Sequence, residues 1–252
     1  MNTAIPCLNI TTSPDKGKYQ MNEVFENYVT NALEKIPSQR QIDCINFNYK
    51  KYFPENKNVE VLDIGVGIGE QMLCFRDWGY NNAVGIDISP ETVEFCKKMD
   101  LNCIQVADTV EYLKANQNRF AVITMSNVIE HIPREQLVDM VKAIYGALTD
   151  GGVALISTPN MQAAEAHLHF FNDVTHLVGF SEHSFRQLFS ACGINDVEFY
   201  GFECFPYKTL KFKFRRFLRA LYWKKVKFAR ACNGILNPSI MHPIFFAIIK
   251  KR

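Results

Sequence analysis

The chain has 252 residues, of which 48% are hydrophobic and 21% are charged, and this composition excludes a disordered or low-complexity protein. The formal net charge is only +2, but all 26 acidic residues lie at or before Glu203. The segment after Glu203 is therefore basic throughout, which suggests an anionic partner for it. The apolar run from Ile244 to Ile249 is too short to span a membrane, which takes about 20 residues.

The cysteines and the N-terminus indicate the cellular compartment. Eight cysteines are scattered along the chain without a CxxC pair, so we expect reduced thiols rather than disulfides or zinc ligands. The N-terminal stretch MNTAIPCLNI has no basic region followed by an apolar run, so no secretory signal is expected. We expect a cytoplasmic protein, which the basic segment could hold on the inner face of the cytoplasmic membrane.

Periodicity predicts two N-terminal helices, at 21–36 and 39–52, and then strands that alternate with helices. Strands are expected at 59–65, 82–89, 102–108, 120–127, 152–160 and 195–204. Helices are expected at 70–79, 90–99, 109–116, 134–148 and 181–193. This alternation predicts a parallel, doubly wound α/β sheet. Three units are expected: a helical cap at 1–57, the sheet domain at 58–204 and a basic extension at 205–252.

A glycine-rich turn follows the first strand, with Gly65, Gly67 and Gly69 in DIGVGIGE. Glycines let the backbone bend with positive φ and come close to a ligand, so the turn predicts a cofactor site. The GxGxG pattern alone would also fit a dehydrogenase-type turn, whose GxGxxG fingerprint cradles a pyrophosphate. Asp63 precedes the glycines here, and an acid at that place suits a cofactor with a positively charged amino acid end.

Two more carboxylates end the next strands. Asp87 ends the second strand, where a carboxylate can accept hydrogen bonds from a ribose diol. Asp108 ends the third strand, where the edge of an adenine would lie. The three acids together predict a site for an adenosine-containing cofactor.

In order and spacing, the segments VLDIGVGIGE, GIDIS, VAD, SNVIEHI and LTDGGVALISTPN resemble the motifs of class I methyltransferases that use S-adenosylmethionine. The resemblance covers about residues 59–200 and implies a Rossmann-like, seven-stranded sheet with an antiparallel strand near its C-terminal end. It implies that the glycines approach the methionine part, that Asp87 holds the ribose hydroxyls and that Asp108 bonds the adenine amino group. The implied cofactor-binding set is Asp63, Gly65, Gly67, Gly69, Asp87, Ile88, Ala107, Asp108, Thr109, Ser126 and Asn127.

Histidines follow the fourth strand and recur in the segment HLHFFNDVTH. Methyl transfer to oxygen needs a base that takes the hydroxyl proton near pH 7, and histidine suits that task. The candidate catalytic residues are therefore His131, His176 and Asp173. For each histidine, a capping or packing role is the alternative.

A divalent metal ion is a second interpretation of this region. Some related O-methyltransferases, including those of ubiquinone synthesis, carry ExxEH here and bind such an ion, whereas this chain has Asn127 in place of their first Glu. That departure weakens the metal interpretation, although Glu130, His131 and His176 could still form a three-ligand site. Glu130 could instead brace its loop.

The stretch NDVTHLVGFSEHSFRQLFSACGI, which begins at Asn172, resembles bacterial methyltransferases of surface-glycan synthesis, which act on sugars of capsules or O-antigen lipopolysaccharide. The resemblance implies O-methylation of a sugar that is free, nucleotide-linked or lipid-linked. One alternative is an O-methyltransferase of a small molecule or quinone precursor. Another is a non-catalytic S-adenosylmethionine-binding membrane adaptor, against which the complete set of cofactor motifs argues.

Residues 206–230, PYKTLKFKFRRFLRALYWKKVKFAR, predict a basic amphipathic helix. Leu210, Phe214, Phe217, Leu221 and Phe228 follow helical spacing. One interpretation is docking on an anionic membrane surface, where each base contributes about 1 kcal/mol before screening. The others are packing on the body or on a partner in a homodimer, and binding of an anionic glycan, nucleotide or RNA. Nucleic acid is the least favoured of these partners.

Overall fold

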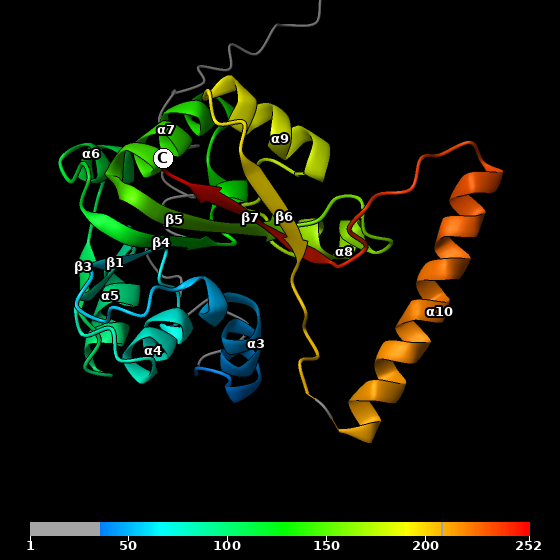
Figure 1. The fold of residues 1–252 in the computed structure, drawn as a ribbon, viewed down its shortest axis with the longest axis horizontal. Coiled ribbons are helices and arrows are strands. Elements are labelled where there is room, and N and C mark those ends of the chain that lie inside the picture. The colour runs from blue at the N-terminus through cyan, green and yellow to red at the C-terminus, as the bar shows by residue number, and fades with distance from the viewer. Residues whose placement is uncertain (1–35, 208) are drawn as a thin grey trace, which may run out of the picture.

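The computed structural model describes residues 36–207 and 209–252, so the helix expected at 21–36 falls, but for its last residue, outside the described residues. A seven-stranded sheet with the order β3-β2-β1-β4-β5-β7-β6 lies between two layers of helices (Figure 1). This is the Rossmann-like, seven-stranded sheet that the resemblance implies.

The strands are β1 (Val61–Ile64), β2 (Ala83–Asp87), β3 (Cys103–Gln105), β4 (Phe120–Ser126), β5 (Leu148–Pro159), β6 (Val197–Gly201) and β7 (Ile244–Lys250). The α-helices are α3 (Gln39–Tyr49), α4 (Glu70–Asp77), α5 (Pro90–Lys97), α6 (Thr109–Lys114), α7 (Leu137–Ala147), α8 (Ala166–Phe171), α9 (Glu182–Ala191) and α10 (Leu210–Cys232). Short 3₁₀ helices are η1 (Lys50–Tyr52), η2 (Ile129–His131) and η3 (Arg134–Gln136). Every strand and helix expected between residues 39 and 204 is present, with ends that differ by a few residues.

The strand β7 corrects the expected division of the chain. It pairs antiparallel with both β5 and β6, whereas the pairings among β1 to β5 are parallel. The boundary between residues 204 and 205 is therefore wrong, because the supposed extension supplies a strand inside the sheet. The antiparallel strand implied by the resemblance is confirmed.

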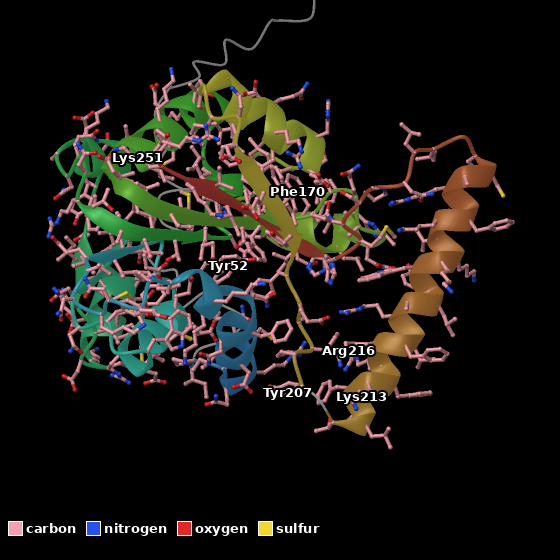
Figure 2. The ribbon with its side chains drawn as sticks, in the orientation of Figure 1. Tyr52, Phe170, Tyr207, Lys213, Arg216 and Lys251 are labelled. Atoms are coloured by element: carbon pink, nitrogen blue, oxygen red, sulfur yellow. The ribbon has the colours of Figure 1, made fainter. Side chains whose placement is uncertain are left out.

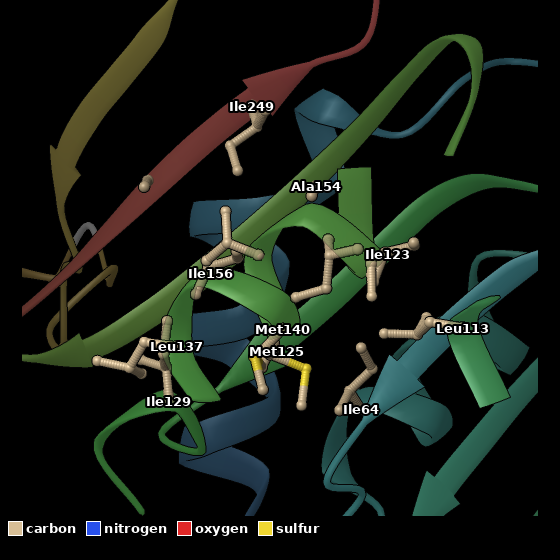
Figure 3. Close-up of a cluster of buried hydrophobic side chains, with 14 of the residues drawn as sticks. Ile64, Leu113, Ile123, Met125, Ile129, Leu137, Met140, Ala154, Ile156 and Ile249 are labelled. Atoms are coloured by element: carbon tan, nitrogen blue, oxygen red, sulfur yellow. The ribbon is translucent and has the colours of Figure 1, made fainter. Parts of the chain in front are cut away.

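Two apolar clusters pack on the two faces of the sheet. Successive strand residues alternate between them, so Ala154 and Ile156 join the first cluster and Leu155 joins the second, as the two-residue period of a strand requires. The first cluster packs the sheet against α6, α7 and α9, and Figure 3 shows part of it around Met125 and Ile156. The second packs it against α3, α4 and α5. Both faces are covered, as expected for a doubly wound sheet.

The described cysteines are all free thiols, and Cys44, Cys74, Cys96 and Cys103 are buried. Burial raises the pKa of Cys44 and of Cys74 to about 12. Because the thiolate is the reactive form, these buried thiols serve the packing of the core.

We expect Ser181→Ala to lower the free energy of unfolding by about 1 kcal/mol, the usual cost of losing an N-cap. The Ser181 hydroxyl accepts a hydrogen bond from the Ser184 amide at 3.1 Å, and the Ser184 hydroxyl accepts one from the Ser181 amide at 2.9 Å. This capping box starts α9. Urea unfolding measures the loss, with the exposed Ser190→Ala on the same helix as the control; equal midpoints for the two variants would contradict the capping role.

The helix α10 stands apart from the two helical layers (Figure 1). It lies in the connection between β6 and β7, which are antiparallel neighbours that a two-residue turn could join. The stretch 202–243 is therefore an insertion, and none of the residues of α10 is buried. The basic helix expected at 206–230 is present as this element. Among the described residues, no helix combines the length and apolar character that crossing a membrane requires.

Candidate functional site

A cavity of about 1010 Å³ opens where β1, β2 and β4 end, at the edge where open α/β sheets bind ligands. Of the predicted site residues, the lining contains Gly65, Gly67, Asp87, Ile88, Ala107, Asp108, Thr109, Ser126, Asn127, His131 and Asp173. The lining does not include Asp63, Gly69, Glu130 or His176. Small-molecule sites usually enclose about 300–1,000 Å³, so this cavity has room for a cofactor and an acceptor together.

The glycine turn forms one wall of the cavity. Gly65, Gly67 and Gly69 have φ angles of 73°, 49° and 82°, a region that side chains other than glycine rarely adopt. A Cβ atom on Gly65 would lie 2.3 Å from the Cγ2 atom of Val128. The turn therefore needs glycine for its backbone angles at all three positions and for space at Gly65.

Asp87 lies at the end of β2 beside this turn. Its Oδ1 accepts a hydrogen bond from the Ser89 amide at 2.9 Å, and its Oδ2 accepts one from the Gly67 amide at 3.4 Å. Burial raises the pKa of Asp87, and these backbone hydrogen bonds oppose the rise. Because a carboxylate oxygen can accept two hydrogen bonds, both oxygens can still receive the hydroxyls of a diol.

Asp108 has a structural role as well as a place in the cavity wall. Its Oδ1 accepts a hydrogen bond from the Glu111 amide at 3.0 Å and so caps α6. Ala107 and Thr109 line the cavity on either side of it. The carboxylate is thus held in place before any ligand binds.

Asp63 lies behind the cavity, and its side chain is buried inside the sheet. Its Oδ1 accepts hydrogen bonds from the Thr124 hydroxyl at 2.7 Å and from the Gln71 amide group at 3.1 Å. Burial raises the pKa of Asp63 to about 8. Gln71 lines the cavity, so Asp63 acts on the site through Gln71.

Asn127 follows β4 with a φ of 52°. This left-handed conformation is uncommon for a residue with a side chain, and such strain gathers at functional sites. The Asn127 amide donates to the carbonyl of Ser157 at 3.0 Å. The strained turn sets Ser126 and Asn127 in the wall of the cavity.

A chain of hydrogen bonds connects His131 to Asp173. The Thr175 hydroxyl donates to Asp173 Oδ1 at 2.6 Å and lies 2.8 Å from Nδ1 of His131. Since the single hydroxyl proton goes to the carboxylate, the Thr175 oxygen accepts from Nδ1 of His131. A neutral His131 ring with its proton on Nδ1 has its lone pair on Nε2.

The protonation of these groups suits a base. Burial lowers the pKa of His131, and the nearby His176 lowers it further, while Asp173 and hydrogen bonds to the backbone of Thr175 and Asn127 oppose the shift. Burial acts to raise the pKa of Asp173, but hydrogen bonds from Thr175 and the two histidines outweigh it, and the net shift is downward. A neutral imidazole beside a charged carboxylate is the arrangement needed to accept a proton.

His176 is close to His131 but does not line the cavity. Their ring centroids are 4.7 Å apart. Nδ1 of His176 lies 2.8 Å from the carbonyl oxygen of Phe170, a residue that is labelled in Figure 2. Because a carbonyl only accepts, Nδ1 carries the proton. Nε2 then faces Oε1 of Glu130 at 3.9 Å. Of the two histidines, His131 is therefore the one that can contact a substrate.

The ligand atoms of Glu130, His131 and His176 all lie within 4.8 Å of one another. Oε1 of Glu130 is buried without a hydrogen-bond partner, which favours an ion. Burial raises the pKa of Glu130 to about 8, so an ion has to displace a proton from this carboxyl group to bind there. Metal bonds of about 2.0–2.2 Å would also require the three atoms to draw together. The group fits a metal ion only in part.

We expect methyl transfer to survive exhaustive treatment with a chelator, because the hydrogen bonds that connect His131 to Asp173 through Thr175 provide a base without an ion. Turnover before and after chelation, with the metal content measured by mass spectrometry, tests this. A loss of activity that Zn²⁺ or Mg²⁺ restores in the wild type but not in Glu130→Gln would contradict the expectation and assign a metal centre.

Tyr49 is a site residue that sequence reasoning missed. It lies on α3 and lines the cavity together with Ile45, and its hydroxyl is 3.4 Å from Oγ of Ser126. Burial raises the pKa of Tyr49 to about 12, so it remains a neutral hydrogen-bonding group. Its spacing of four from Ile45 put both on one helix face, which was the available signal. Residues of α3 and residues 172–175 thus line the cavity together.

Comparison with known proteins finds similarity to methyltransferases. A family model described as a methyltransferase domain matches residues 29–198, and a search of curated protein sequences gives no significant match. A S-adenosylmethionine-dependent methyltransferase of Archaeoglobus fulgidus is 20% identical, with a TM-score of 0.63 over 91% of this chain and 99% of that one. A possible histamine N-methyltransferase of Thermotoga maritima is 14% identical, with a TM-score of 0.57 over 93% and 97%. At such identities the likeness shows the fold.

A third similar structure is phosphoethanolamine N-methyltransferase 2 of Haemonchus contortus in complex with S-adenosylmethionine. It is 19% identical, with a TM-score of 0.56 over 94% of this chain. The chain spans 59% of the length of that protein, so the likeness concerns only part of it.

Proposed function

We propose that the chain, which belongs to the methyltransferase domain family, methylates a hydroxyl group on a sugar of a bacterial surface glycan. S-adenosylmethionine is its methyl donor, since the chain is folded like methyltransferases that depend on S-adenosylmethionine. The observation that supports transfer to an oxygen atom is the set of hydrogen bonds that connects His131 through Thr175 to Asp173. This set begins at the wall of the same cavity that the glycine turn lines.

The cavity wall offers a matching contact for each part of the cofactor. Gly65 and Gly67 make the cradle for the methionine part, and Asp87 is placed to receive the two ribose hydroxyls. Asp108, already fixed as the cap of α6, faces the adenine end. Asp63 would act through Gln71, which is close enough to the turn to bond the amino acid end.

The proposed reaction needs one proton acceptor and one oriented hydroxyl. S-adenosylmethionine supplies an electrophilic methyl group on a sulfonium. Nε2 of His131 takes the acceptor's hydroxyl proton as the oxygen forms its bond to the methyl carbon and the carbon–sulfur bond breaks. The products are the methyl ether, S-adenosylhomocysteine and a protonated His131. Thr175 and Asp173 stabilise that imidazolium, because the negative carboxylate lies one hydroxyl away from it.

The sequence of the segment that lines the cavity beside His131 supports a sugar as the acceptor. Residues 172–175 line it, and they belong to the stretch NDVTH that resembles glycan methyltransferases. Transfer to nitrogen is the second candidate, because two of the similar structures are named as N-methyltransferases. A base beside the acceptor favours oxygen, since a hydroxyl must lose its proton during transfer.

A transfer assay with labelled S-adenosylmethionine tests the proposal against panels of sugar nucleotides, lipid-linked glycans, catechol-type quinone precursors and primary amines. We expect label in a sugar methyl ether, located by mass spectrometry. Label only in an amine or a phenol would replace the sugar assignment. Binding of NAD in place of S-adenosylmethionine would overturn the assignment of the cofactor, and cofactor binding without transfer to any panel would favour the adaptor interpretation.

A further inference from the structure

One side of α10 fixes the helix to the body. Its half-buried residues recur every three or four positions and form an inner stripe, which consists of Phe212, Arg216, Arg219, Trp223, Val226 and Arg230. The Arg219 guanidinium forms a bidentate salt bridge with the Glu203 carboxylate, with N–O distances of 2.9 and 2.5 Å. Arg230 donates to the Gln162 carbonyl at 2.6 Å, and the Trp223 ring lies 4.8 Å from that of His242. These contacts determine which side of the helix faces outward.

The opposite side of α10 is apolar and exposed. Its outer stripe consists of Leu210, Phe214, Phe217, Leu221 and Phe228, whose exposed fractions range from 46% to 83%. Several of them stand two positions from an inner residue, which is about 200° around a helix axis. Figure 2 shows Arg216 on the side of α10 that faces the body. A row of large apolar side chains held away from the body needs a partner to cover it.

Positive charge surrounds the outer stripe. The helix α10 contains nine lysines and arginines and no acid. Lys213, Lys224 and Lys225 each lie three or four residues from two members of the stripe, so they flank it on the same surface. Lysine stems can pack along an apolar surface while their ammonium groups reach outward. The flanking charges therefore fit a layer of anionic groups that lies above an apolar phase.

We infer that the outer stripe docks the protein on a bilayer that contains anionic lipids. The helix lies in the plane of the surface, with the phenylalanines and leucines among the acyl chains and the lysines at the lipid phosphates. The docking does not depend on the nature of the methyl acceptor, so it goes beyond the proposed function. The inner stripe keeps the body on the aqueous side.

Two other occupants fit the face less well. A second copy that presented the same stripe would bring together two helices that each carry nine bases and no acid, and like charges repel. A nucleic acid would match the charge and could stack on phenylalanines, but it offers nothing to Leu210 and Leu221. Of these three occupants, an anionic bilayer satisfies both the charge and the apolar row.

Co-sedimentation of the full chain with vesicles tests the inference. We expect binding to vesicles of mixed phosphatidylglycerol and phosphatidylcholine, weak binding to phosphatidylcholine alone and partial release at high salt, where charges are screened. The triple change Phe214→Gln, Phe217→Gln and Phe228→Gln should lower the partition coefficient about tenfold or more. Phe171→Gln on α8, where the side chain is 80% exposed, is the control for a lost exposed aromatic side chain.

A charge variant gives a second measurement. Lys213→Glu, Lys224→Glu and Lys225→Glu together should lower binding to the acidic vesicles about tenfold or more. Lys97→Glu, Lys98→Glu and Lys142→Glu change the charge equally at exposed positions elsewhere and should leave binding unchanged. Cofactor affinity, measured for every variant, shows that each one is folded. Wild-type binding by the triple glutamine variant, or a wild-type dimer that this variant converts to a monomer, would overturn the inference.

Discussion

The His131→Ala variant is expected to lose about 10²–10⁴-fold in turnover, the usual contribution of a general base, while its affinity for S-adenosylmethionine stays close to that of the wild type. His131 lines the cavity, and the Thr175 hydroxyl lies beside its Nδ1, so under the proposed function its Nε2 takes the proton. Steady-state rates at saturating cofactor give the effect on turnover, and calorimetry gives the affinity.

Two further variants show whether His131 acts as a base. His169→Ala removes an exposed histidine outside the cavity lining and should leave turnover unchanged. Thr175→Val removes the hydroxyl between His131 and Asp173 and should reduce turnover less than His131→Ala does, because the imidazole is still present. A folded His131→Ala enzyme with wild-type turnover on its true acceptor would give the histidine a packing role instead.

The Asp87→Ala variant is expected to bind S-adenosylmethionine about 30- to 150-fold more weakly. Losing charge-assisted hydrogen bonds to a diol costs about 2–3 kcal/mol, and each 1.4 kcal/mol is about tenfold in affinity. Calorimetry measures the change in dissociation constant. Turnover at saturating cofactor should change much less, because the proposed contact of Asp87 is with the ribose and not with the methyl group.

The loss of Asp87 also removes the acceptor for the Ser89 and Gly67 amides, so a control for local structure is needed. Asp87→Asn keeps an oxygen that can accept from the backbone, and it should show an intermediate affinity. Asp150→Ala removes an exposed carboxylate elsewhere and should bind like the wild type. Unchanged affinity in a folded Asp87→Ala protein would remove Asp87 from the cofactor site.

The sequence predicts the alternating elements well because each carries a local signal, such as Ser89 and Pro90 at the start of α5. The strand β7 carries no such signal. Its residues are buried on both faces, so they form an unbroken apolar run without the alternation that marks a half-buried strand. The position of that run inside the sheet depends on pairing with β5 and β6, which are distant in the sequence, and a local pattern cannot reveal it.

The candidate site shows the same limit at the level of single side chains. The sequence locates strand ends, and Asp87 and Asn127 both line the cavity. It does not give the direction of a side chain. The sequence therefore could not show that Asp63, one residue before the end of β1, is buried behind the site. His176 lies behind His131 for a similar reason, because its direction is set by the Phe170 carbonyl. Tyr49 was missed because it comes from a helix outside the cofactor motifs.

The place of β7 in the sheet has a consequence for protein synthesis. The strand is the last of the seven to leave the ribosome, yet it lies between β5 and β6, so β6 has no partner in the sheet until β7 arrives. Making residues 160–243 takes on the order of ten seconds at usual translation rates. Throughout that time β5 presents an unpaired apolar edge, which is a template for association with other chains. Newly made chains are therefore most prone to aggregate before β7 has been made, and chaperones that shield strand edges should raise the yield of folded enzyme.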